Sequence, residues 1–243
     1  MNYKTRGIII KRRNFGEADR ILTIFTKNRG KISAIAKGVR KTLSKLGGHV
    51  ELFYVVDLIL SEGRNFDIVT GAEIIENFPN LRNNIKLAEQ SYYIAELTDK
   101  LVNDSSEASE IYDLLYKTLE SVNNKNNPLA LRYFELWFLS ELGHKPETDL
   151  CAKCRNDLNA RELFWSNELG GVVCKDCKTS VNNSERIDVD IVKIIRLFLN
   201  YDINIINRIK INREQGQRLE YIIENFIKYI TDYEFNSKKF TKG

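Results

Sequence analysis

Four cysteines are the residues of this sequence whose type and spacing most clearly indicate chemistry. Cys151 and Cys154 form one Cys-x-x-Cys pair, Cys174 and Cys177 form a second, and nineteen residues separate the pairs. This spacing is typical of a zinc site in which four thiolates complete a tetrahedral shell. Because a complete shell leaves no open position for a substrate, we expect Zn²⁺ to be structural here rather than catalytic.

Other catalytic chemistry finds little support in the sequence. The chain has only two histidines, His49 after a Gly-Gly turn and His144 after Gly143, and such positions are typical of a surface or a helix end. A phosphate-binding loop, a Gly-x-Ser-x-Gly elbow and a His-Glu-x-x-His helix are all missing. Neither cysteine pair follows a strand that opens a βαβ unit, which disfavours a redox role. We therefore expect a protein that is not an enzyme.

The formal net charge of +4 conceals a strong asymmetry along the chain. Residues 1–48 hold thirteen Lys or Arg and two acids, a net charge of +11, whereas residues 49–177 carry −10 and residues 178–243 carry +3. So basic a segment indicates a surface that binds a polyanion. The alternative interpretation is a solvated, lysine-rich surface without a ligand.

The basic segment lies within a region that reads as β-structure. Runs rich in β-branched and aromatic residues predict strands at 5–11, 20–26, 31–37, 52–60 and 66–70. Within residues 31–37, apolar and polar side chains alternate, which predicts one wet, cationic face. Five short strands indicate a small barrel of the OB-fold type, which presents such a face to an oligonucleotide.

After the predicted strands, the apolar period lengthens from two toward 3.6 residues, which predicts helices that pack in a bundle. A short hairpin is expected within residues 164–173, between the cysteine pairs. We therefore expect a multidomain α+β protein. Its predicted parts are an OB-fold barrel at 1–80, an α-helical domain at 81–147 and 179–243, and an inserted four-cysteine zinc finger at 148–178.

The apolar runs of the chain are only a few residues long, far below the roughly 18 that a membrane-spanning helix needs. The segment Gly7–Ile10 is also too short for the apolar part of a secretion signal. We therefore expect a cytoplasmic protein that does not bind a membrane. In the cytoplasm its thiols stay reduced.

Several motifs of the sequence resemble one known family. Near the N-terminus these are Gly7–Ile10, Gly16–Ile21 and Ile35–Lys41, and further on they are Leu142–Pro146, running into Cys151, and Gly170–Cys174. Together with the cysteine spacing, these motifs resemble the bacterial recombination mediator RecO. They span most of the chain in the order that the family has.

The resemblance implies a noncatalytic DNA-binding protein of recombinational DNA repair, in the bacterial cytoplasm and associated with the nucleoid. RecO-like proteins bind single- and double-stranded DNA, anneal complementary strands, associate with RecR, and help RecA replace the single-strand-binding protein SSB. For this chain the implied partners are therefore DNA, RecR, the C-terminal tail of SSB and, indirectly, RecA.

The charge count and the matching motif together predict the residues that bind DNA. The first choices for phosphate contacts are Lys37, Arg40 and Lys41, with Lys11, Arg12, Arg13, Arg20, Arg29 and Lys45 as a supporting field. Phe15 and Phe25 are candidates for stacking on bases, although a place in the barrel core is the favoured interpretation of Phe25.

Two further hypotheses concern partners. The acidic SSB tail would suit the basic C-terminal helices, which carry Arg196, Arg208, Lys210, Arg213 and Arg218. Outside the family, an RNA-binding OB-fold plus zinc-finger protein of translation or transcription stays open, because a basic barrel face alone does not separate RNA from DNA.

Overall fold

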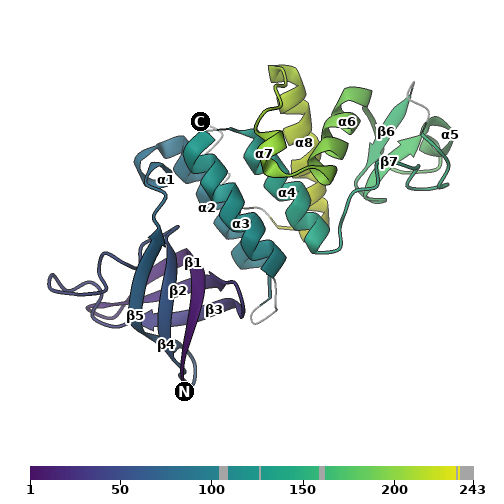
Figure 1. Cartoon of the computed structure of the whole chain (residues 1–243). Helices are drawn as coiled ribbons and strands as arrows, with labels where there is room; N and C mark the ends of the chain where they lie inside the picture. The colour runs from purple at the N-terminus through teal and green to yellow at the C-terminus, as the bar shows by residue number, and fades with distance from the viewer. Residues whose placement is uncertain (104–108, 126, 159–161, 234, 236–243) are drawn as a thin grey trace. The chain divides into compact units, whose positions relative to one another are not determined.

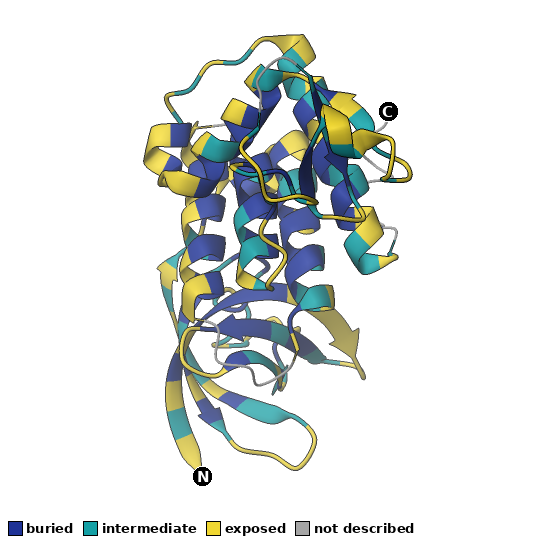
Figure 2. Ribbon diagram, turned by 90° about the vertical axis from the view of Figure 1, so that its right-hand side faces the viewer, coloured by how far each residue is buried: buried dark blue, intermediate teal, exposed yellow. Residues whose placement is uncertain are grey.

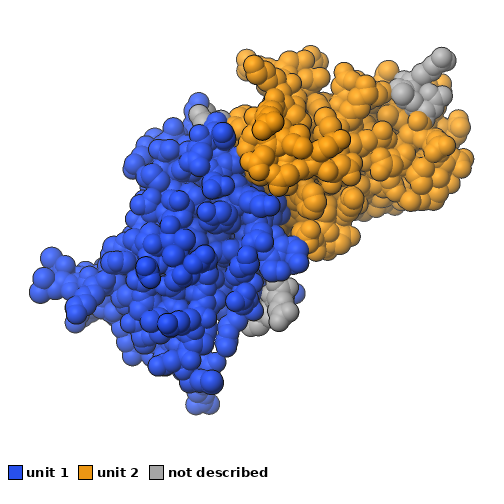
Figure 3. Space-filling model, in the orientation of Figure 1, with its two compact units in different colours: residues 1–126, 235–243 blue, residues 127–234 orange. Residues whose placement is uncertain are grey.

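The computed structural model of the 243-residue chain describes residues 1–103, 109–125, 127–158, 162–233 and 235. Its contacts divide the chain into two compact units, residues 1–126 with 235–243, and residues 127–234 (Figure 3). The first unit groups the helices that follow the strands with the strands themselves. The division at residues 80, 147 and 178 that the sequence suggests stays a prediction about separate domains.

Five strands close a barrel at the N-terminus (Figure 1). They are β1 Asn2–Phe15, β2 Asp19–Thr26, β3 Gly30–Ala36, β4 Val55–Ser61 and β5 Asp67–Glu76. The strand order is β1-β2-β3-β5-β4, with β1 pairing to both β2 and β4, and only β3 and β5 run parallel. This closed five-stranded arrangement is that of the OB-fold, so the predicted barrel is confirmed.

The strand pattern places one face of β3 inside the barrel. Ala34 and Ala36 are fully buried and belong to the barrel core, whereas Ser33 and Lys37 are exposed. Figure 2 colours buried, intermediate and exposed residues along the whole ribbon. The alternation that the sequence predicts for residues 31–37 is therefore confirmed.

Several strand boundaries differ from the sequence-based ones, and β1 is longer at both ends than the predicted 5–11. The strand predicted from Leu52 begins at Val55, because Phe53 has a φ of 66°, which extended strands do not allow. Its N–H instead bonds the carbonyl of Ile9 over 2.8 Å. The last strand continues to Glu76, well past the predicted end at Thr70, because it keeps pairing with β4.

Three helices complete the described part of the first unit: α1 Asn80–Asn83, α2 Ile85–Leu101 and α3 Ser109–Lys125. Asn84 caps α2, since its side-chain oxygen accepts from the N–H groups of Lys86 and Leu87. The buried residues of α3 recur with helical period, as predicted. Helix α2 packs against β1 and α3, so it lies beside the barrel.

The second unit combines helices with a small sheet. Its elements are α4 Leu129–Glu141, β6 Leu163–Ser166, β7 Gly171–Cys174, α5 Lys175–Lys178, β8 Glu185–Ile187, α6 Val189–Asn200, α7 Ile203–Ile206 and α8 Arg213–Thr231. Helix α4 packs against α6, α7 and α8, and the sheet has the order β7-β6-β8. The predicted hairpin is β6–β7. Within the described ranges, no helix is long and apolar enough to span a bilayer.

Candidate nucleic-acid interface and metal site

The cations of the barrel fall into two groups, and the first group is paired with acids. Arg20 Nη1 lies 2.8 Å from a carboxylate oxygen of Glu51, which also pairs with Arg12. Lys11 Nζ lies 2.7 Å from Asp99. The remaining paired cations are Arg6 with Asp57, Lys27 with Asp113, Arg29 with Glu62 and Lys31 with Asp99. Much of the local +11 is thus neutralised within the chain.

The second group has no acidic partner among the described residues. It consists of Lys4, Arg13, Lys37, Arg40, Lys41, Lys45 and Arg64, and all seven are exposed. Four of these follow β3 in one loop, between β3 and β4, and we call Lys37, Arg40, Lys41 and Lys45 the loop cations. Of the five predicted DNA-binding residues without an acidic partner in the described part of the chain, four therefore lie in one segment.

The loop that carries these cations is anchored at its start. The N–H of Gly38 donates to Asp19 Oδ1 over 2.7 Å, and the N–H of Arg40 donates to the carbonyl of Ala18 over 2.9 Å. The guanidinium of Arg40 donates to the carbonyl of Gly16 over 3.3 Å. These bonds join two of the sequence motifs named above, Gly16–Ile21 at the β1–β2 turn and Ile35–Lys41 at the end of β3.

The loop returns to the barrel through apolar contacts. Val39 and Val50 are buried in the barrel core, and Leu46 packs against it. The N–H of Ser44 donates to the carbonyl of Lys41 over 3.0 Å, which forms a turn between these anchors. The loop cations are thus presented on backbone that is tied down at both ends.

The two candidate stacking residues differ sharply. Phe25 is fully buried, as its core interpretation predicts, and is therefore not a stacking candidate. Phe15 is 49% exposed at the end of β1, next to the turn that anchors the loop. Of these two residues, Phe15 is the one that is open to a base.

The four cysteines meet in the second unit. Their sulfur atoms all lie within 4.8 Å of one another, and Cys154 Sγ is 3.9 Å from Cys174 Sγ. A tetrahedral ion with metal–sulfur bonds of about 2.3 Å sets its sulfurs about 3.8 Å apart. The cluster therefore has metal-binding geometry, and Cys151, Cys154, Cys174 and Cys177 would hold the ion.

The backbone favours a thiolate within this cluster. Burial opposes ionisation of Cys151, which is fully buried, but hydrogen bonds from the backbone N–H groups of Cys154, Cys174 and Lys153 outweigh it and lower its pKa to about 6. Desolvation and the neighbouring sulfurs raise the pKa of Cys177 to about 12. The neighbouring sulfurs thus oppose a negative charge on Cys177. A bound metal cation would stabilise that charge, because cysteine binds metals as the deprotonated thiolate.

We call the four cysteines together with strands β6 and β7 the metal module, and an isolated bridge between Glu147 and Gly171 supports it. The N–H of Glu147 donates to the carbonyl of Gly170 over 2.9 Å, and its carbonyl accepts from the N–H of Val172 over 2.8 Å. A Cβ on Gly171 would collide with that carbonyl of Glu147. The Gly-Gly pair before Cys174 therefore has a steric reason: it lets two backbone segments approach closely.

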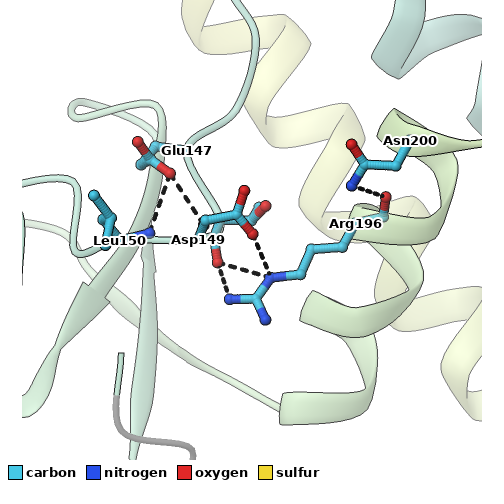
Figure 4. Close-up of polar contacts among 6 residues, drawn as sticks. Glu147, Asp149, Leu150, Arg196 and Asn200 are labelled. Carbon is cyan, nitrogen blue, oxygen red and sulfur yellow. Dashed lines mark hydrogen bonds and ion pairs between the residues drawn. The ribbon is translucent and has the colours of Figure 1, made fainter. Parts of the chain in front are cut away.

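Side chains fix the same segment against α6 (Figure 4). The Glu147 carboxylate accepts from the N–H groups of Asp149 and Leu150 over 3.0 and 3.2 Å. Although burial raises the pKa of Glu147, these bonds help to lower it below its ordinary value. Arg196 donates to the carbonyl of Thr148 over 2.9 Å and lies 3.2 Å from Asp149.

The five cations predicted to bind an acidic tail also fall into a paired group and an unpaired group. Arg196 holds the metal module, and Arg218 donates to the carbonyl of Arg186 over 2.5 Å and pairs with Glu185 at 3.1 Å. The other three are exposed and have no acidic partner within the described part of the chain: Arg208, Lys210 and Arg213.

Comparison with known proteins identifies the family. The family model described as Recombination protein O N terminal matches residues 1–78, and the one described as Recombination protein O C terminal matches residues 91–239. A DNA repair protein RecO of Dehalococcoides mccartyi is 39% identical over 234 residues, which cover 96% of this chain and 92% of that protein. The chain belongs to the RecO family.

Other relatives agree over nearly the full length. A RecO protein of Alkaliphilus metalliredigens is 33% identical and covers 100% of this chain and 99% of its own length. One from Roseiflexus is 32% identical over 98% of this chain and 84% of its own. The resemblance seen in the motifs is confirmed, and RecO membership gives the chain a role in DNA repair, which implies DNA binding.

Proposed function

We propose that this chain is a noncatalytic recombination mediator that binds DNA and anneals complementary single strands. With RecR, it helps RecA to load on DNA coated by SSB, in the cytoplasm at the nucleoid. The observation that carries DNA binding is the set of loop cations, which are exposed, anchored and without acidic partners among the described residues.

Unpaired cations suit this function better than paired ones. A lysine or arginine that is free of carboxylates displaces counterions from DNA when it meets a phosphate, whereas a paired one must first give up its acid. Contacts with phosphates carry no sequence information, so such a surface accepts any strand. A mediator that acts wherever DNA is damaged needs this tolerance.

The same electrostatics account for annealing. Two complementary strands repel each other, and a cationic surface that neutralises part of their charge lets them approach without any bond being made or broken. Phe15 adds one exposed ring beside the loop anchor, where stacking on a base would contribute about 1–3 kcal/mol.

We propose that the ion held by the four cysteines is Zn²⁺ and that it is structural. The spacing of the pairs and the sulfur separations support this assignment. Zinc bound by four thiolates has no open position, which agrees with a noncatalytic protein.

For the SSB tail we propose the exposed cations Arg208, Lys210 and Arg213. Binding of a fluorescent peptide with the acidic, apolar-ended tail sequence tests this site. The Arg213→Ala variant should bind the peptide more weakly, whereas Arg218→Ala, whose guanidinium bonds groups of its own unit, should bind like the wild type. Equal affinities for wild type and Arg213→Ala would discard the site.

An annealing assay tests the mediator function as a whole. Complementary single strands are each coated with SSB and mixed with the protein in the absence of nucleotide, and duplex formation is followed by fluorescence. We expect acceleration with DNA strands. No acceleration would contradict the proposal, and faster annealing of RNA than of DNA would favour the RNA-binding alternative.

A further inference from the structure

A hollow of about 280 Å³ opens on the outer face of the barrel. Lys11, Thr23 and Ser33 are cross-strand neighbours on β1, β2 and β3, and they line it together with Arg13 and Lys31. The residues next to Thr23 and Ser33 along their strands belong to the barrel core, so the hollow faces outward. We call it the Asp99 hollow, after the acid that enters it from α2.

Asp99 neutralises two of the three cations of this hollow. Its carboxylate lies 2.7 Å from Lys11 Nζ and 3.8 Å from Lys31 Nζ, and its backbone carbonyl accepts from Lys31 over 2.5 Å. The Lys31 side chain is only 12% exposed, whereas that of Lys11 is 56% exposed. Arg13 has no acidic partner among the described residues. The lining therefore holds three cations around a single carboxylate.

This lining has the chemistry of a phosphate site. A phosphodiester, like a carboxylate, carries one negative charge and accepts hydrogen bonds on two free oxygens. Lysine, arginine and hydroxyl side chains are the usual donors to such oxygens, and Thr23 and Ser33 supply the hydroxyls. Phe66 also lines the hollow and suits a base next to that phosphate, which favours a nucleic-acid strand over a free ion.

We propose that the Asp99 hollow binds a phosphate of a DNA strand and that Asp99 is its internal competitor, whose carboxylate occupies Lys11 until the strand displaces it. This inference rests on the proposed DNA-binding function. It adds that an acidic side chain of the protein itself competes with DNA for one of the cations. A strand held by the loop cations is at high local concentration for a second site on the same barrel. Entry into the hollow exchanges a helix–barrel contact for a DNA–barrel contact.

Removing the competitor tests the proposal. Affinity for a fluorescent oligothymidylate is measured by anisotropy for the wild type and for Asp99→Asn, from 50 to 200 mM salt. With Lys11 released, one more phosphate contact should tighten binding about threefold at 50 mM salt, and the gain should shrink as salt rises.

A matched variant controls for the change in net charge. Glu73 lies on β5, is exposed and has no cationic partner among the described residues, so Glu73→Gln removes one negative charge without releasing a lysine. We expect its affinity to change less than twofold. A gain equal to that of Asp99→Asn would show a general charge effect and would overturn the proposal.

Lys11→Ala supplies the decisive comparison, since it leaves the backbone contact between Lys31 and Asp99 in place. In the wild-type background, Lys11 is already neutralised, so its removal should weaken binding less than twofold. In the Asp99→Asn background, the same change should weaken binding about threefold. Equal effects in both backgrounds would overturn the proposal.

One comparison avoids Asp99 altogether, in case Asp99→Asn loosens α2. At 50 mM salt, Arg13→Ala should weaken binding more than Lys11→Ala, because only Arg13 is unpaired in the free protein. The reverse order would contradict the inference. A wild-type protein that does not bind the oligonucleotide would instead contradict the proposed function itself.

Discussion

The backbone N–H of Arg40 donates to the carbonyl of Ala18 over 2.9 Å, which fastens the loop after β3 to the turn between β1 and β2. Beside it, the N–H of Gly38 donates to Asp19 Oδ1. Two motifs that are separate in the sequence thus form one structural unit. The loop cations depend on this anchoring as well as on their own charge.

Gly38 is the point at which the anchoring can be tested. Its φ of +63° lies in the left-handed region, which costs roughly 1–2 kcal/mol for a residue with a Cβ. We expect Gly38→Ala to lower the free energy of unfolding by about that amount in urea titrations, and to weaken DNA binding through the displaced loop.

Gly48 provides the matched control in the same connection between β3 and β4. A Cβ there meets no atom within 4 Å, and the backbone is not left-handed. Gly48→Ala should therefore leave stability within about 0.5 kcal/mol of the wild type. Equal losses in the two variants would contradict the special role of the Gly38 backbone.

The pH dependence of stability tests a cross-strand ion pair of the barrel. Arg6 Nε and Nη2 each lie 2.7 Å from an oxygen of Asp57, and their hydrogen bonds hold the pKa of Asp57 below its ordinary value of 3.8. The stabilisation is therefore fully present above that ordinary value and is lost as the pH falls through the lowered pKa.

The Asp57→Asn variant makes this effect measurable. Above about pH 5 it should be less stable than the wild type by roughly 0.2–1 kcal/mol, since the pair is about half exposed. The difference in unfolding free energy should narrow as the pH falls below 4. A difference that stays constant down to pH 2 would show that Asp57 does not act through its charge.

Removal of the metal tests the role of the cysteine cluster. Trp165 of β6 is buried and packs edge-to-face on Phe226 of α8, with ring centroids 5.5 Å apart, so in a Trp137→Phe background the fluorescence of Trp165 reports on the metal module. We expect one equivalent of zinc per chain, and we expect chelation to shift the emission to the red and to lower the melting temperature. Unchanged melting after complete removal of the metal would contradict a structural role.

Local patterns were enough to predict much of this protein. The alternation in β3 indicates which residues enter the core, because a strand has a period of two. The cysteine spacing likewise indicates the metal cluster, because each Cys-x-x-Cys pair brings two sulfurs to one ion. The five strands and the helical stripes follow from the same kind of local information.

The division of the cations into paired and unpaired groups could not be predicted in this way. Lys11 meets Asp99 across 88 positions of the chain, and Arg20 meets Glu51 across 31. No local pattern encodes such contacts, since they arise only when the barrel closes and α2 packs beside it. For the same reason, the sequence does not indicate that Arg12, Arg20 and Arg29 are paired with acids, and their contact with DNA stays a prediction.

The most direct test of the account compares two quadruple variants with the same loss of charge. One replaces the loop cations Lys37, Arg40, Lys41 and Lys45 by Ala, and the other replaces the paired cations Arg6, Arg12, Lys27 and Arg29. Affinity for single-stranded DNA is measured against salt, with circular dichroism to confirm folding.

If about five phosphates are engaged, log affinity of the wild type should fall with log salt at a slope of about −3.5. The loop variant should lose most of this slope, since four contacts contribute about 2.8 of it, and should bind far more weakly at 50 mM salt. The paired-cation variant should keep a slope close to that of the wild type. Wild-type affinity and slope in the loop variant would contradict the central claim that the unpaired loop cations bind DNA.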